Sequence, residues 1–294
     1  MLEAALVFFR FLHFASCIFV FGASVFSIAL LSASGAQTCT EGLQPALRFS
    51  AVAAAVTALF WFQCVAGTMT GSASSATDPD VLQTLLLNTS FGQTWLVRMV
   101  LALVLAIVAF RAAPEARIST AALSGLLLAS VALTGHAAMQ RGIEGAAHRL
   151  ADAIHLLSGG YWIGAVAALP FLLRPAQSPD LTHRILCRFS GLGVIAVIVA
   201  LASGVLNTLF IVQDWSHILS FAYGKILLGK VSLVVIMAII ACVNRFLLMP
   251  TFRKGNSSFR SLKRSVLAET LAGGLIVLAA SLLGTVSPPL SSPM

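Results

Sequence analysis

The stretch FLHFASCIFVFGASVFSIALLSASGAQTCT, residues 11–40, runs for 30 residues without one charged side chain. A bilayer core of about 30 Å needs roughly 20 apolar residues for each helical span. The stretch is therefore long enough to cross a membrane as one helix. Its histidine, His13, is a costly residue in such a setting and calls for an explanation.

Similar charge-free runs cover residues 49–77, 156–173, 189–213 and 270–294. Of the 294 residues, 59% are hydrophobic and 10% are charged, against about 25% charged in an average soluble domain. The alternation typical of a membrane β-barrel is absent, so helices must satisfy the backbone in lipid. We predict an all-α polytopic membrane protein with about eight transmembrane helices, near 8–31, 47–69, 92–111, 117–138, 149–173, 186–213, 222–248 and 263–286.

The basic residues predict the orientation of these helices. With the N-terminus outside, twelve of the eighteen Lys and Arg residues fall at the inner side, and the outer loop at 70–90 has none. The positive-inside rule then predicts that both termini lie outside the cytoplasm, an N-out/C-out topology in the bacterial inner membrane. The first helix lacks a basic region before it and is predicted to be retained rather than cleaved.

Several function classes find no support in the sequence. The five cysteines are scattered, so no disulfide framework is implied. The membrane topology explains the distribution of the positive charges, so we expect the lipid bilayer rather than nucleic acid as a partner. Nucleophile elbows and phosphate-binding loops are absent, so we do not expect an enzyme of those classes. Whether the chain forms a homo-oligomer stays open.

The two halves of the chain repeat three short patterns in the same order. An even number of helices in each unit would make the repeats parallel. We predict a single transmembrane domain, 1–294, built from a first four-helix repeat at 1–140 and a second at 141–294. The matched stretches are HFASCIFVFG (13–22) with HLLSGGYWIG (155–164), RFS (48–50) with RFS (188–190), and FGQTWLVR (91–98) with YGKILLGK (223–230).

Three histidines are predicted at similar depth near the outer side. His13 and His155 lie in the first helix of each repeat, and His136 lies at the outer end of the fourth predicted helix. If these helices are neighbours, the three imidazoles can converge on one metal ion. The first helix adds Cys17 one turn from His13, and imidazole with sulfur is the ligand set expected for copper rather than magnesium or calcium.

Other residues could complete or support that site. His148, Asp152 and His155 are spaced i, i+4 and i+7, on one stripe of a helix. Asp152 is a candidate to orient a histidine ring, and Met139 and Met69 could offer sulfur near the outer side. A histidine near a helix end is more often an interhelical hydrogen-bonding group, and we expect this for His148.

Polar residues elsewhere in the predicted helices mark a path or a structural role. Arg98 and Lys230 occupy matching places in the two repeats, and either could pair with Asp152. Near the inner side, a contact between Glu269 and Arg245 would avoid an unpaired carboxylate. Asn207 suits close helix packing.

The quoted patterns, with TGHA at 134–137 and LAETL at 267–271, together resemble the copper resistance protein D family (CopD or PcoD) of bacterial inner membranes. The resemblance covers nearly the whole chain and keeps the order of the motifs. It implies a protein of copper homeostasis that moves copper ions toward the cytoplasm, with His13, His136 and His155 as functional histidines. It also implies a separate periplasmic copper-binding partner of the CopC type.

Two alternative functions stay open at this stage. Two histidines at equal depth on facing helices could ligate haem b, giving a protein for electron transfer or cupric reduction. A copper sensor or scaffold without ion flux is the third class. The copper oxidation state is not set by the sequence, so both Cu(I) and Cu(II) are considered.

Overall fold

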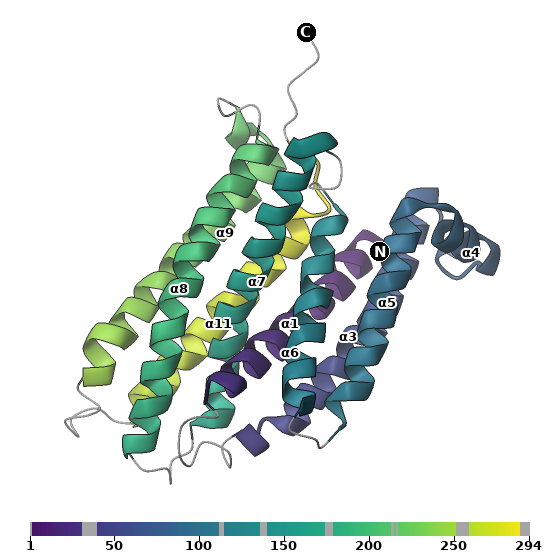
Figure 1. Cartoon of the computed structure of the whole chain (residues 1–294). Helices are drawn as coiled ribbons and strands as arrows, with labels where there is room; N and C mark the ends of the chain where they lie inside the picture. Colours follow the sequence, from purple (N-terminus) through teal and green to yellow (C-terminus); the bar gives the residue numbers. More distant parts are fainter. Residues whose placement is uncertain are drawn as a thin grey trace.

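The computed structural model describes residues 2–30, 40–111, 115–135, 140–173, 179–212, 215, 217–250 and 259–288, all of them helical or irregular. Eight helices in this part of the chain are long and apolar enough to cross a membrane, which confirms the predicted polytopic all-α fold. The bundle is drawn in Figure 1. Its long helices are α1 (Leu2–Leu30), α3 (Gln44–Thr70), α5 (Ser90–Ala109), α6 (Glu115–Ala129), α7 (Gly142–Leu172), α8 (Pro179–Ile211), α9 (Ala222–Val243) and α11 (Phe259–Leu283).

Shorter elements extend or connect these helices. A 3-10 turn, η2 (Ser130–Leu133), continues α6, and a π-helix, η5 (Asn244–Leu248), continues α9. Two further 3-10 turns are η1 (Ser74–Ala76) and η4 (Ile218–Ser220). The sequence did not predict α4 (Pro79–Asn88), a helix at the side of the bundle in Figure 1. It begins where the Asp78 carboxylate accepts hydrogen bonds from two backbone amides of its first turn.

The predicted helix boundaries are close to those observed, but several helices start earlier. α7 begins at Gly142 rather than 149, and α8 begins at Pro179 rather than 186. Both extensions carry polar and charged residues such as Glu144 and Asp180 in their first turns, where acidic side chains suit the helix dipole. A prediction based on apolar length alone therefore misses the polar first turns.

Helices α1 and α7 form the centre of the bundle. α1 packs on α3, α6 and α7, while α7 packs on α8, α11 and α1. The two central helices touch where Gly22 meets Gly164: a Cβ on Gly164 would lie 2.1 Å from the carbonyl oxygen of Ile18. A Cβ on Gly22 would lie 2.6 Å from the backbone nitrogen of Ala165. Only glycine permits this approach of two backbones.

We refer to the two ends of the bundle by their residues. The outer end holds the first residues of α1, α5, α7 and α9, and the inner end holds the first residues of α3, α6, α8 and α11. Arg48, Arg117, Arg184 and Lys263 belong to the inner end. The names follow from the positive-inside rule, which assigns the basic end to the cytoplasm.

Candidate functional site

His13 is held in α1 by a carbonyl of the neighbouring helix. Its Nδ1 lies 2.9 Å from the carbonyl oxygen of Ala54 on α3. Because a carbonyl only accepts, Nδ1 carries the proton and Nε2 keeps its lone pair. Nε2 faces the thiol of Cys17, whose Sγ lies 3.6 Å away. Both side chains are fully buried, with His13 0% exposed.

This ring orientation is the one that metal-binding histidines adopt. A hydrogen bond from the second ring nitrogen to a backbone carbonyl fixes the tautomer and aims the free nitrogen. With bonds of about 2.0 and 2.3 Å, as in zinc sites, donors 3.6 Å apart subtend about 110° at one ion. The pair formed by His13 and Cys17 can therefore supply two ligands to one soft metal ion.

Aromatic side chains enclose His13. The ring of Trp61 on α3 lies 5.4 Å from the imidazole, and Trp61 packs edge-on against Phe14 and Trp95. Aromatic pairs of this kind contribute about 0.5–1.5 kcal/mol each beyond their buried area. The pair of ligands thus sits in a rigid, apolar wall built by α1, α3 and α5.

Arg98 on α5 brings a buried positive charge to this wall. Its guanidinium lies 4.5 Å from the Trp95 ring and is 0% exposed. It donates to Ser130 Oγ at 3.1 Å, to the Ser130 carbonyl at 2.8 Å and to Thr134 Oγ1 at 3.0 Å. Its Nη1 makes no hydrogen bond within the part of the chain that the structure describes. Arg98 interacts electrostatically with Cys17 rather than pairing with Asp152.

Arg10 adds a second cation on the outer side of His13. Its Nη1 donates to the carbonyl of Gly284 at 2.9 Å, which ties α1 to the end of α11. Its guanidinium also lies 5.3 Å from the Phe14 ring and 5.4 Å from the Trp61 ring. The surroundings of His13 are therefore positively charged, which opposes a bare cation and favours an ion bound together with a negative ligand.

His155 repeats this arrangement in the second half. Its Nδ1 lies 2.9 Å from the carbonyl oxygen of Ala200 on α8, and Ser203 Oγ lies 3.4 Å from the same nitrogen. In the first half, Thr57 Oγ1 lies 3.5 Å from His13 Nδ1. Each hydroxyl also donates to a carbonyl one turn earlier on its own helix, at 2.6 Å in both halves. His155 is partly exposed, whereas His13 is fully buried.

These pairs occupy corresponding places, and we infer from them a duplicated four-helix unit. The two histidines are 142 positions apart, and the accepting alanines are 146 apart. Gly92 and Gly224 are also matched, since a Cβ on either would lie 2.0 Å from a carbonyl of the preceding segment. The RFS matches do not fit this register: Ala54 follows Arg48 by six residues, whereas Ala200 follows Arg188 by twelve.

Asp152 does not orient His155, contrary to the prediction. The Ala200 carbonyl does so, while Asp152 Oδ1 accepts a hydrogen bond from Asn207 Nδ2 at 3.0 Å. Lys230 and Arg10 both interact electrostatically with the carboxylate. Asn207 thus serves as more than a packing residue. Of the two cations predicted as partners of Asp152, the structure brings Lys230 to it.

His148 takes the interhelical role expected for it. Its ring is 1% exposed, stacks on Phe210 at 5.0 Å and bonds through Nδ1 to Gln140 Oε1 at 2.9 Å. Gln140 in turn donates to the Phe210 carbonyl at 3.1 Å. This network fastens the start of α7 to the end of α8.

Other predicted ligands are not assembled by the described residues. His136 and Met139 lie outside them, and Met69 is 63% exposed at the end of α3. Within the described ranges, no group of three or more His, Cys, Asp and Glu side chains is placed to hold one metal ion. The three-histidine site stays a prediction.

The predicted contact between Glu269 and Arg245 is replaced by two others. Arg245 donates to the carbonyl of Ser190 at 3.0 Å. Glu269 is 1% exposed and hydrogen-bonds with Asn244, which also accepts from Ser265. Both residues lie in the π-helix, from which Arg245 reaches α8 and Asn244 reaches α11.

Sequence reasoning missed the groups that fix the histidines. The accepting carbonyls of Ala54 and Ala200 leave no trace in residue type, and Thr57 and Ser203 look like ordinary small polar residues of membrane helices. One signal existed: in each half a hydroxyl residue follows the accepting alanine by three positions. The RFS motifs match at a different offset, so aligning the halves on RFS does not reveal this signal.

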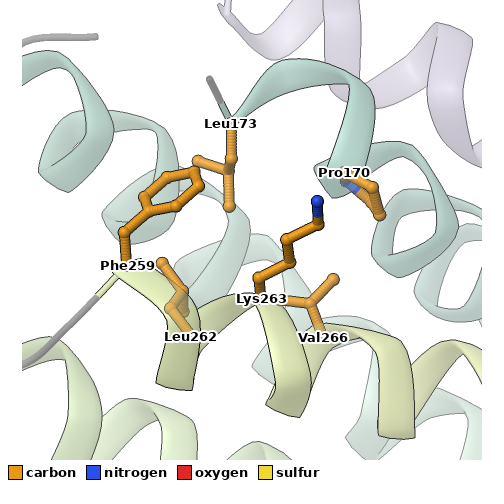
Figure 2. Close-up of a pocket in the computed structure, with 6 residues that line it drawn as sticks. All are labelled: Pro170, Leu173, Phe259, Leu262, Lys263 and Val266. Atoms are coloured by element: carbon orange, nitrogen blue, oxygen red, sulfur yellow. The ribbon is translucent and has the colours of Figure 1, made fainter. Parts of the chain in front are cut away.

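A small pocket at the inner end of α7 and α11 lies apart from these histidines. Figure 2 shows its lining, in which the side chain of Lys263 extends from α11 toward α7 among apolar neighbours. It contains no candidate metal ligand. Its residues are Pro170, Leu173, Phe259, Leu262, Lys263 and Val266.

The fold defines a multi-pass membrane protein with a buried His–Cys pair on its first helix. The family described as copper resistance protein D-like, N-terminal domain, matches residues 1–146, and copper resistance protein D matches residues 183–283. The chain belongs to the copper resistance protein D family, as its resemblance predicted.

Three curated relatives support this assignment. Copper resistance protein D of Pseudomonas syringae pv. tomato is 30% identical over 97% of both chains. Inner membrane protein YebZ of Escherichia coli (strain K12) is 31% identical over 95% of this chain and 97% of its own. Copper transport protein CutJ of Bacillus subtilis (strain 168) is 34% identical over 76% of this chain and 42% of its own. No solved structure matches the chain.

Proposed function

We propose that this protein is a copper homeostasis protein of the inner membrane that moves copper ions from the periplasm toward the cytoplasm. The family and the names of its relatives support the link to copper, and eight membrane-spanning helices support the location. The observation that carries the site is the free Nε2 of His13, 3.6 Å from the Cys17 thiol. His155 and His136 are its proposed companions.

The chemistry of this pair favours Cu(I). Thiolate and imidazole together select soft ions, and one thiolate with Cu(I) is electrically neutral. A fully buried pocket with Arg98 beside it tolerates a neutral complex far better than a divalent one. The ion would reach His13 from the outer end, where a periplasmic copper-binding protein of the CopC type is the proposed donor.

Copper uptake by proteoliposomes tests this function. Liposomes containing the full chain should accumulate Cu(I), and those containing His13→Ala or Cys17→Ser should accumulate at least about tenfold less. Variant His217→Ala, at an exposed position of the outer side, should match the native protein. Absence of uptake by the native chain, together with retained copper binding, would instead identify a sensor or scaffold.

A second candidate, a b-type haem protein, is favoured by one observation. His13 and His155 both present an unprotonated Nε2, and Arg10 and Arg98 near His13 each keep a buried nitrogen without a partner among the described residues. Haem needs axial nitrogen ligands, and its propionates suit cations. An absorption band at about 410 nm in the purified protein, lost in His13→Ala and in His155→Ala, would select this function over transport.

A further inference from the structure

A second His–Cys pair lies at the inner end of the bundle. His183 and Cys187 are four residues apart on α8, and Sγ lies 3.6 Å from Nε2 and 3.7 Å from Nδ1. The pair of His13 and Cys17 has the same spacing and the same 3.6 Å separation. The chain thus carries the pattern His-x-x-x-Cys twice, as HFASC at 13–17 and HRILC at 183–187, once near each side of the membrane.

The two pairs differ in exposure. Cys17 is buried in the core, whereas Cys187 is exposed and His183 is partly exposed. A buried cysteine commonly serves as a small apolar residue of the core. Cys187 lies outside the core cluster and faces out of the bundle, seven residues from the inner end of the candidate span Asp180–Ile211.

The i, i+4 spacing places both side chains on one face of α8, and a turn of the His183 imidazole, whose two nitrogens lie almost equally far from Sγ, would let one ion bind both. Donors 3.6 Å apart fit bonds of about 2.0 Å to nitrogen and 2.3 Å to sulfur at an angle of about 110°. Imidazole and thiolate favour Cu(I) among the ions of a copper protein, and exposure leaves further coordination positions open. An acceptor molecule could therefore take the ion directly by adding its own ligands.

We propose that His183 and Cys187 form an accessible Cu(I) site at the cytoplasmic end of α8, from which copper leaves the protein. The assignment as an exit site rests on the proposed direction of transport. The binding of Cu(I) does not, and it can be measured without any flux.

Thiol labelling resolved by mass spectrometry tests the site in the full-length protein. In lipid nanodiscs under reducing, oxygen-free conditions, Cys187 should react with N-ethylmaleimide. At a free Cu(I) concentration about ten times the Kd, its reaction should slow about tenfold. Cys242, which is also exposed, should react at the same rate with and without Cu(I).

The variant His183→Ala should retain the metal-free labelling rate of Cys187 and lose most of the protection. Unchanged protection in this variant, or none in the native chain, would overturn the proposed site. In His13→Ala the protection of Cys187 should persist even where uptake is lost. That result separates a failure of the outer site from a failure of the inner one.

Discussion

The two halves of the bundle share the histidine geometry and a nearby cation, Arg98 or Lys230, but differ in one further charge. In the first half, Arg10 lies against the ring of Trp61, whereas in the second half Asp152 accepts a hydrogen bond from Asn207. Asp152 follows Arg10 by 142 positions, and Asn207 follows Trp61 by 146. These are the same offsets that relate the two histidines and their carbonyl partners.

The two matching pairs therefore differ at both positions. In the first half the cation, Arg10, lies against an aromatic ring, whereas in the second half the anion, Asp152, accepts a hydrogen bond from an amide group. Because Arg10 and Asp152 also attract each other, the charges join the two halves. Two copies of either half would bring like charges together. The two halves thus share the histidine clamp and carry complementary charges beside it.

The glycine contact between the halves should give the largest effect. Gly164→Leu forces side-chain atoms into the backbone of α1 near Ile18, and we expect loss of most folded protein in detergent, measured by size-exclusion chromatography. Gly22→Leu should be nearly as damaging. The control Gly191→Leu faces open space and should yield normal amounts of protein. Normal folding of both Gly22 and Gly164 variants would show that α1 and α7 do not meet there.

The histidines give the next largest effect. His13→Ala and His155→Ala should each reduce copper uptake at least about tenfold while folded protein is retained, because each removes a nitrogen donor. Uptake of radioactive copper into proteoliposomes measures this loss. Full uptake by His155→Ala with none by His13→Ala would break the functional equivalence of the halves and restrict the site to His13 and Cys17.

The sequence predicts the fold far better than the site. Charge-free length and the positions of Lys and Arg are properties of residue type, so they give eight spans and their order directly. The matched histidines, His13 and His155, are likewise visible in the sequence. Their orientation depends on the carbonyls of Ala54 and Ala200, which every residue possesses. Only the packing of α1 on α3 and of α7 on α8 decides which carbonyls accept the hydrogen bonds of the histidines.

Charge partners were equally hard to predict, for a related reason. The sequence allows Arg98 to pair with Asp152, but the 3-10 turn at the end of α6 offers Arg98 a carbonyl and two hydroxyls nearby. The sequence predicts a contact between Glu269 and Arg245, but Arg245, which lies in the π-helix, donates to Ser190 instead. Local backbone irregularities of this kind carry no clear apolar pattern, so spacing arguments based on a regular helix fail there.

The two matched cations, Arg98 and Lys230, should contribute differently to the free energy of unfolding. Arg98→Ala leaves Ser130 and Thr134 without their charged donor and should lower the unfolding free energy by about 3 kcal/mol. Lys230→Ala removes the cation that attracts the Asp152 carboxylate but no hydrogen bond among the described residues, so it should cost less, about 1 kcal/mol. Thermal unfolding in detergent compares them. Equal losses would mean that the second half buries its cation as firmly as the first.

The hydroxyls beside the histidines should give the smallest effect. Thr57→Val and Ser203→Ala remove groups 3.5 and 3.4 Å from the ring nitrogens, distances longer than the 2.9 Å bonds to the alanine carbonyls. Because those carbonyls already take the ring protons, copper affinity should fall only about twofold to threefold. Competition with a Cu(I) chelator measures this. A loss of copper affinity as large as that of the histidine variants would mean that the hydroxyls, rather than the carbonyls, fix the rings. The clamp common to both halves would then consist of side chains, which can be recognised from the sequence alone.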